Sequence, residues 1–170
     1  MRANRFDPEK ALNAILWIAR RIPCPTFHSI SKLLYFADRL HLERYGRLIT
    51  GDSYVAMKHG PVPSGAYDIM KAVRGDGTCA REEEAREAFA VDGHYDVVPR
   101  RAANDSLFSE SDRECLEEAI QQYGSLSFQE LTDRSHDAAW HSADENDSIE
   151  LEQIIATLPD GASLLEHLHR

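Results

Sequence analysis

The sequence predicts one mostly helical domain of the α+β class, with a small antiparallel β-sheet packed on the helices. Apolar residues recur at helical spacing in several segments, and most of these segments begin with a capping residue. Two short extended regions with turn residues inside them predict the sheet. At 170 residues and 42% hydrophobic side chains, the chain is long enough to bury one core. We expect a single domain over residues 1–170, with its core in 7–140 and an acidic loop and short helices in 141–170.

Three helices are predicted in the first half of the chain. Asp7 as N-cap and Pro8 at the first helical position indicate where the first helix begins. The second helix begins near Thr26 and runs to Tyr45, and its wide apolar arc predicts the central, most buried helix. Ser64 is the expected cap of the third helix.

The predicted sheet comprises residues 48–58 and residues 89–98. In the first region Gly51-Asp52 is a candidate two-residue turn, and in the second Asp92-Gly93 is a strong hairpin signal. Residues 59–63, His-Gly-Pro-Val-Pro, follow the first region. Because proline fixes φ and restricts the residue before it, this segment predicts a rigid, non-helical corner.

Two capping boxes indicate helices in the second half of the chain. They pair Ser109 with Asp112 and Ser127 with Glu130. The helix that follows Ser127 is expected to continue to about Trp140. The chain is then expected to form an acidic loop over 144–147 and short helices over 149–158 and 162–169.

Targeting and redox features predict a cytoplasmic protein. Residues 1–10 show no apolar run behind a basic start, so no secretory signal is expected. The longest nearly apolar stretch, residues 14–19, is far shorter than the roughly 18 residues that a membrane-spanning helix requires. Three isolated cysteines, Cys24, Cys79 and Cys115, suit neither a disulfide framework nor a zinc site.

The net charge of -10 conceals two halves of opposite sign. Residues 1–75 contain twelve Lys and Arg against six Asp and Glu, whereas residues 76–170 contain seven against twenty-three. Either a basic face packs beside an acidic one within the molecule, or the acidic half attracts a basic partner and accelerates their association. The sequence leaves both explanations open.

Catalytic and metal-binding chemistry finds little support in the residue pattern. Asp38 and His41 share a helix face, and Asp52 and His59 lie nearby in the sequence, but this spacing matches no known ligand motif. The chain contains no nucleophile elbow and no glycine-rich phosphate loop. We therefore expect no enzymatic activity, no cofactor and no metal.

The expected helices over 110–123 and 128–140 have helix-turn-helix proportions, which raises the alternative of DNA binding. The would-be recognition helix carries Glu130, Asp133 and Asp137 against a single arginine. Such a surface repels phosphates, so we do not expect nucleic acid as the partner of this helix. Because the first half of the chain is basic, nucleic-acid binding by that half stays an open alternative.

The corner at residues 59–63 is the candidate partner-binding surface. Glycine and proline restrict the unbound conformations, so a partner that docks there loses little entropy. Its neighbours offer aromatic, adaptable and charged contacts, and Asp38 and Arg39 lie on the narrow polar strip of the central helix. The alternative is a rigid turn that only connects a strand to a helix. The predicted partner-binding residues are Asp38, Arg39, Tyr54, Met57, Lys58, His59, Pro61 and Val62.

Two blocks of the sequence resemble a known family. The first block contains Lys32-Leu33-Leu34-Tyr35-Phe36-Ala37-Asp38, Gly51-Asp52-Ser53-Tyr54 and His59-Gly60-Pro61-Val62-Pro63. The second contains Phe108-Ser109-Glu110-Ser111-Asp112, Leu126-Ser127, Glu130-Leu131 and Ser135-His136 to Trp140. In this order they resemble the Panacea domain of the SocA-like antitoxins, over most of residues 7–140.

The resemblance implies an antitoxin, which neutralises a toxin protein encoded beside it by direct contact. Two alternatives stay open: an adaptor that delivers a bound protein to an ATP-dependent protease, and a DNA-binding autorepressor. The family pattern has no catalytic residues to transfer; it implies Tyr54, His59, Gly60 and Pro61 as structural or interface positions. The sequence does not decide whether the protein forms a homodimer. The chain after Trp140 resembles the family less and is the candidate region for partner choice.

Overall fold

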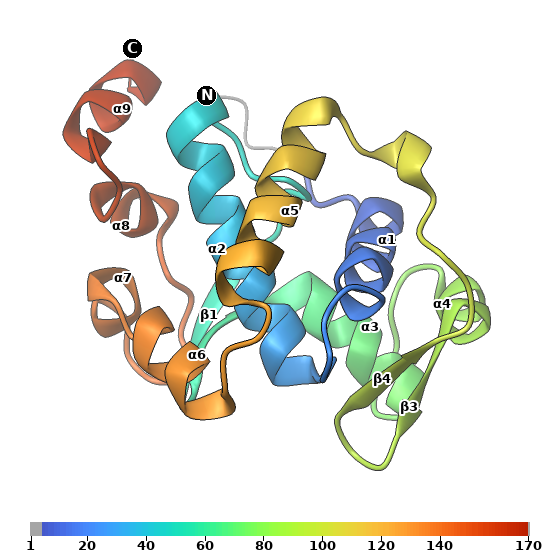
Figure 1. Cartoon of the computed structure of the whole chain (residues 1–170). Coiled ribbons are helices and arrows are strands. Elements are labelled where there is room, and N and C mark those ends of the chain that lie inside the picture. Colours follow the sequence, from blue (N-terminus) through green and yellow to red (C-terminus); the bar gives the residue numbers. More distant parts are fainter. Residues whose placement is uncertain (1–4, 170) are drawn as a thin grey trace.

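The computed structural model describes residues 5–169 (Figure 1). The fold is α+β and mostly helical, which confirms the predicted class. Two small antiparallel sheets of two strands each replace the single sheet that we expected. The elements are α1 (Pro8–Ala19), α2 (Phe27–Tyr45), β1 (Tyr54–Met57), β2 (Gly60–Pro63), α3 (Ser64–Arg74), α4 (Glu82–Ala88), β3 (Phe89–Asp92), β4 (Asp96–Pro99), the 3-10 turn η1 (Asp105–Leu107), α5 (Glu110–Tyr123), α6 (Phe128–Ser135), α7 (Ala138–His141), α8 (Leu151–Ala156) and α9 (Gly161–Leu168).

Helix α2 lies at the centre of the molecule, with α5 packed along it and α1 to one side (Figure 1). Thr26 accepts a hydrogen bond from the backbone N–H of Ser29 and so caps its N-terminus. Gly46 ends the helix in the left-handed conformation, with φ of 74°. The buried residues of α2 include Lys32, Asp38 and His41 as well as apolar side chains. Its predicted bounds and central position are therefore confirmed.

The first hairpin differs from the prediction, because residues 60–63 form strand β2 and not only a corner. Lys58-His59 is the turn, and β1 pairs with β2 from Met57 opposite Gly60 to Tyr54 opposite Pro63. The prolines of β2 stand at alternate positions of the ladder, where a ring nitrogen points away from β1 and no hydrogen bond is lost. The prediction that the first extended region lies within residues 48–58 was therefore wrong.

Residues 48–50 do not form a strand, so the predicted turn at Gly51-Asp52 is also wrong. Their backbone groups bond to other partners: the N–H of Ile49 donates to the carboxylate of Asp38 at 2.8 Å, and the carbonyl of Thr50 accepts from Asp7 at 2.9 Å. The second hairpin, β3 and β4, agrees with the predicted region 89–98.

The cap of helix α3 comes from Asp52, and not from Ser64 as the sequence suggested. The Asp52 carboxylate accepts hydrogen bonds from the backbone N–H groups of Gly65 at 2.8 Å and Ala66 at 2.9 Å. The side chain of Ser64 makes no capping bond. A carboxylate twelve residues upstream fills the role, because the loop before β1 returns to the start of α3.

The outer edge of β1 is covered by the C-terminal part of the chain. The N–H of Ala56 donates to the carbonyl of Asp147, and the N–H groups of Asn146 and Ile149 donate to the carbonyls of Ala56 and Tyr54. Since β2 pairs with the opposite edge, β1 offers neither edge to another chain.

The helix predicted from Ser127 to about Trp140 is interrupted. Helix α6 ends at Ser135, and a separate turn, α7, begins after Asp137, whose carboxylate accepts from the N–H of Trp140 at 3.0 Å. The capping box of Ser127 and Glu130 is formed as predicted. The break turns the ring of Trp140 toward the β1–β2 hairpin.

Ion pairs join the basic first half of the chain to the acidic second half. Lys10 and Arg47 both contact the fully buried carboxylate of Asp112, with N–O distances of 2.7 and 3.1 Å. Arg44 contacts Glu118 at 2.5 Å. The internal explanation of the charge asymmetry therefore accounts for part of it.

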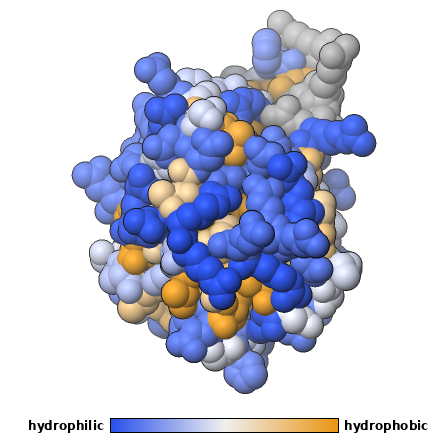
Figure 2. All heavy atoms as spheres, turned by 90° about the vertical axis from the view of Figure 1, so that its right-hand side faces the viewer, coloured by the Kyte–Doolittle hydropathy of each residue, from blue (hydrophilic) through white to orange (hydrophobic). Residues whose placement is uncertain are grey.

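The face that carries α4 and the β3–β4 hairpin is mostly hydrophilic, with apolar atoms in small scattered patches (Figure 2). Tyr95 and Val98 are exposed apolar side chains of this hairpin. Single exposed apolar side chains are ordinary on a protein surface. Within residues 5–169, no helix is long and apolar enough to span a membrane.

Candidate partner-binding site

The turn of the first hairpin is held from several sides. The indole Nε1 of Trp140 donates to the carbonyl of Met57 at 2.8 Å, and the ammonium of Lys32 donates to the carbonyl of Pro61 at 3.0 Å. The ring of Phe128 meets the ring of His59 edge-on, with their centroids 5.1 Å apart. Side chains of α2 and α7 thus hold the backbone on both sides of the turn, at Met57 and at Pro61.

Lys32 is an unusual support for the turn, because its side chain is buried and faces a carbonyl instead of a carboxylate. Among the described residues it makes no ion pair. Burial disfavours the charged form and lowers the pKa of Lys32 to about 7. The amine is therefore partly neutral near physiological pH.

Gly60 permits the close packing beneath the turn. Its φ of +122° lies in a region that other residues rarely adopt. A Cβ atom at this position would overlap the hydroxyl of Ser135 and lie 2.6 Å from Cε of Lys32. Only glycine allows the hairpin to approach both α2 and α6 in this way.

His28 packs beside the same turn in its neutral form. Its Nε2 lies 2.9 Å from the hydroxyl of Thr132 on α6. Burial, followed by the charge of Lys32, lowers the pKa of His28 to about 3. The ring therefore joins α2 to α6 without adding charge at neutral pH.

Aromatic rings extend from the turn onto the surface. Phe128, at the start of α6, stacks on His28 at 3.8 Å and meets the ring of His59 edge-on at 5.1 Å. Its side chain is nevertheless 51% exposed. Trp140 stacks on His136 at 3.8 Å. We name the set Lys58, His59, Phe128, His136 and Trp140 the corner surface.

A shallow hollow adjoins the corner surface. Its volume is about 410 Å³, and it lies between β1 and the segment that follows α7. Lys58, Trp140 and His141 line it together with Asp144 and Glu145. The surface therefore combines aromatic rings, an exposed cationic side chain and an acidic margin.

The eight predicted partner-binding residues divide between the surface and the interior. Lys58 and His59 are exposed, and Met57 and Arg39 are partly exposed. The other four, Asp38, Tyr54, Pro61 and Val62, are buried. In this conformation these four support the hairpin from within and do not reach a partner at the surface.

Asp38 and Tyr54 show what this internal role is. The hydroxyl of Tyr54 donates to the Asp38 carboxylate at 2.7 Å, and the other carboxylate oxygen accepts from the N–H of Ile49. Burial raises the pKa of Asp38 to about 7. Arg39 points instead toward the C-terminal half, where it contacts Asp137 at 3.1 Å and Thr157.

A comparison with protein-family models identifies the family of the chain. The model described as "Antitoxin SocA-like, Panacea domain" matches residues 30–141. The chain belongs to this family. No curated protein and no solved structure matched it.

The Panacea match includes every member of the corner surface but stops before the C-terminal helices. Residues Lys58 and His59 come from the hairpin, and Phe128, His136 and Trp140 come from the end of the matched segment. Helices α8 and α9 lie outside it. The Panacea segment thus assembles the corner from two sequence blocks that are about seventy residues apart in this chain.

Sequence reasoning missed His28, Phe128, His136 and Trp140 as members of the site. The pair His136 and Trp140 was part of the block that resembles the family, but its place beside the turn follows only from the fold. Phe128 carried one usable signal, as a large apolar residue at the first position of an acidic helix. His28 carried none.

Asp38 and His41, which share a helix face, do not form a pair in this Panacea domain. His41 bonds to the carbonyl of Arg47 at 2.8 Å and to the hydroxyl of Ser111 at 2.9 Å. Across residues 5–169, no group of three or more His, Cys, Asp or Glu side chains is arranged to hold a metal ion. Cys115 is buried, as expected of a small core residue.

Proposed function

We propose that this protein is an antitoxin that neutralises a cognate toxin protein by direct contact through the corner surface. Membership of the SocA-like Panacea family carries the proposal. The geometry of the corner supports the choice of surface, because the turn is held by side chains of α2, α6 and α7 before any partner arrives. A preformed surface loses little conformational entropy on binding, which favours a long-lived complex.

The residue types of the corner also suit a protein interface. Interface contacts of high energy are enriched in aromatic residues near the centre of the contact. Phe128 is the exposed ring of the corner, and the neighbouring histidines hold it in one orientation. We therefore expect Phe128 to be the principal anchor of the complex.

Co-expression with the neighbouring open reading frame tests the function. We expect that product to arrest growth alone and to be harmless when this protein is present. A harmless neighbour, or a toxin that this protein fails to neutralise, would contradict the proposal. The half-life of the toxin distinguishes occlusion from delivery to a protease, because occlusion leaves toxin turnover unchanged.

The variant Phe128→Ala tests the surface. We expect it to weaken toxin binding by about 2 kcal/mol or more, equivalent to about thirtyfold, because a central aromatic anchor is lost. Tyr95→Ala is the matched control, since Tyr95 is 56% exposed on the other hairpin and Phe128 is 51% exposed. Equal neutralisation by both variants, with both shown to be folded, would place the contact elsewhere.

A further inference from the structure

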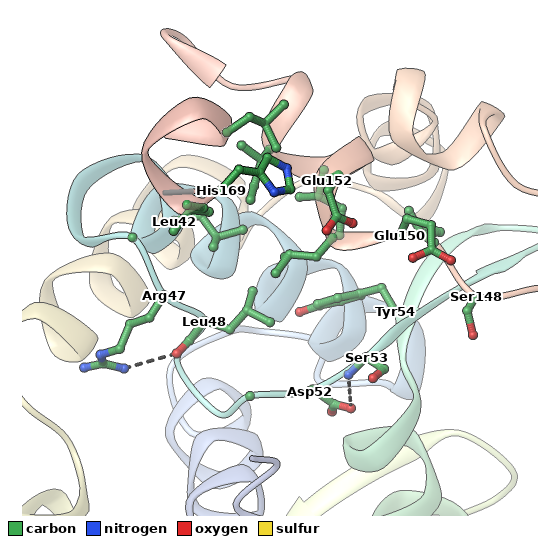
Figure 3. Close-up of a pocket in the computed structure, with 18 residues that line it drawn as sticks. Leu42, Arg47, Leu48, Asp52, Ser53, Tyr54, Ser148, Glu150, Glu152 and His169 are labelled. Atoms are coloured by element: carbon green, nitrogen blue, oxygen red, sulfur yellow. Dashed lines mark hydrogen bonds between the residues drawn. The ribbon is translucent and has the colours of Figure 1, made fainter. Parts of the chain in front are cut away.

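A groove lies between the C-terminal helices and the end of α2 with the loop that follows it (Figure 3). Its volume is about 650 Å³. One wall is the end of α2 and the loop that leads to β1, and the other is α8, α9 and the segment before them. Figure 3 shows Leu48 and Tyr54 across the hollow from Glu152 and His169.

The interior of the groove is lined largely by apolar side chains. Leu42, Leu48 and Tyr54 lie beneath one side and are themselves buried. Helices α8 and α9 supply Ile154, Ile155, Leu165 and Leu168, of which the two leucines of α9 are only partly buried. An apolar lining of this kind accepts the side chains of an amphipathic helix.

The charge at the mouth of the groove has one sign. Between residues 141 and 169 the sequence has seven acidic residues and no Lys or Arg. In the part of the chain that the structure describes, no ion pair engages six of them: Asp144, Glu145, Asp147, Glu150, Glu152 and Asp160. This differs from α5, where Asp112, Glu114, Glu117 and Glu118 are paired with basic residues of the first half. Of these six, Glu150 and Glu152 line the groove, and no ion pair of the described residues neutralises them.

The other charged groups that line the groove are already occupied. The guanidinium of Arg47 donates to the carbonyl of Leu48 and pairs with Asp112, and Figure 3 shows it directed away from the hollow. The carboxylate of Asp52 accepts the N–H groups of Ser53, Gly65 and Ala66. Glu150 and Glu152 thus determine the sign of the potential that an approaching partner meets.

We propose that this groove binds a basic amphipathic helix of the partner protein, with its apolar face on the partly exposed Leu151, Leu165 and Leu168 and its Lys or Arg side chains beside Glu150 and Glu152. The proposal rests on the antitoxin function and specifies a second contact for the same partner. A helix fits better than an added strand, because both edges of β1 are already paired.

The groove also explains how one member of the family selects its partner. Its α8–α9 wall lies outside the segment that matches the family model, whereas the corner surface lies within it. The family segment forms the corner surface, and the C-terminal helices add a contact from outside that segment. Opposite charge then accelerates the encounter and disfavours acidic partners.

Titration of the isotope-labelled full chain with a synthetic helical peptide of Leu and Lys tests the groove without the toxin. We expect chemical-shift changes at Leu165, Leu168 and Ser148, and binding that weakens as salt is added. A peptide in which Glu replaces every Lys is expected not to bind. Equal shifts from both peptides, shifts confined to other regions, or no shifts would overturn the proposal.

The double variant Glu150→Lys and Glu152→Lys tests the margin. We expect it to bind the Leu and Lys peptide about tenfold more weakly, because two attractive charges become repulsive. Glu83→Lys with Glu87→Lys on α4 is the matched control, since these glutamates are also exposed and make no ion pair within residues 5–169. Unchanged affinity in the groove variant would overturn the proposal.

The two proposals fail in different ways. If the neighbouring product proves harmless, the antitoxin function fails, while the peptide titration still decides the groove. If the toxin is neutralised equally well by the wild type and by the Glu150→Lys and Glu152→Lys variant, the function stands and the groove proposal is overturned. Slower association of that variant with the toxin, with loss of its salt dependence, supports both.

Discussion

At the scale of single residues, the corner depends on Gly60 and Lys32. The absence of a side chain at Gly60 lets the buried stem of Lys32 pass beneath the turn and reach the carbonyl of Pro61. Because the ammonium has no carboxylate partner among the described residues, the close fit of the surrounding groups holds it in place. A small increase in side-chain volume at position 60 should therefore lower the stability of the protein considerably.

Gly60→Ala is predicted to destabilise the protein by about 3 kcal/mol, because the new methyl group adds overpacking to backbone strain. The added Cβ would meet both Ser135 and Lys32. Gly75→Ala is the control, since Gly75 also has a positive φ but open space around its Cβ position. It should lose only about 1 kcal/mol from strain. Urea unfolding of both variants measures the difference, and equal losses would mean that packing under the turn contributes nothing.

At the scale of elements, local signals predicted the helices better than the hairpin. Asp7, Thr26 and Gly46 lie at helix ends and act through bonds to nearby residues, so the sequence displays them. Strand β2 could not be predicted from the sequence, because proline usually breaks the hydrogen-bond ladder of a sheet. Pro61 and Pro63 are tolerated because, in the observed register, their ring nitrogens point away from β1. The break between α6 and α7 was hidden for a similar reason, since Asp137 interacts with Tyr35 and Arg39 of a distant helix.

The cap of α3 gives a direct test at this scale. Asp52→Ala should cost about 2 kcal/mol, because two N–H groups at the start of α3 lose their acceptor in a buried place. Ser64→Ala should change the free energy of unfolding by less than about 0.5 kcal/mol, because its hydroxyl caps nothing. Denaturant unfolding of the two variants compares them. If Ser64→Ala lowered the free energy of unfolding more than Asp52→Ala, Ser64 would be the cap, as the sequence suggested.

At the scale of the whole molecule, the sequence indicated the region of the candidate site but not its composition. It identified Lys58 and His59, which are exposed at the turn, and it assigned to the surface four residues that the fold buries. Phe128, His136 and Trp140 join the turn only because α6 and α7 fold back on the hairpin (Figure 1). A contact between residues so far apart in the chain has no local pattern in a single sequence.

The charge asymmetry illustrates the same limit. Both explanations left open by the sequence contribute to our account: α5 pairs with basic side chains of the first half, and the acidic C-terminal segment is proposed to meet a basic partner. The composition of the sequence is enough to calculate the net charge of each half of the chain. Only the positions of the side chains separate the paired carboxylates from the unpaired ones.

Side-chain footprinting of the complex shows directly whether the toxin occupies the corner surface. Hydroxyl radicals should oxidise both Phe128 and Tyr95 in the free protein, since about half of each side chain is exposed. On addition of the neighbouring gene product, we predict that Phe128 and Trp140 become protected while Tyr95 is oxidised as before. A stable complex in which Phe128 stays as reactive as in the free protein would contradict the account.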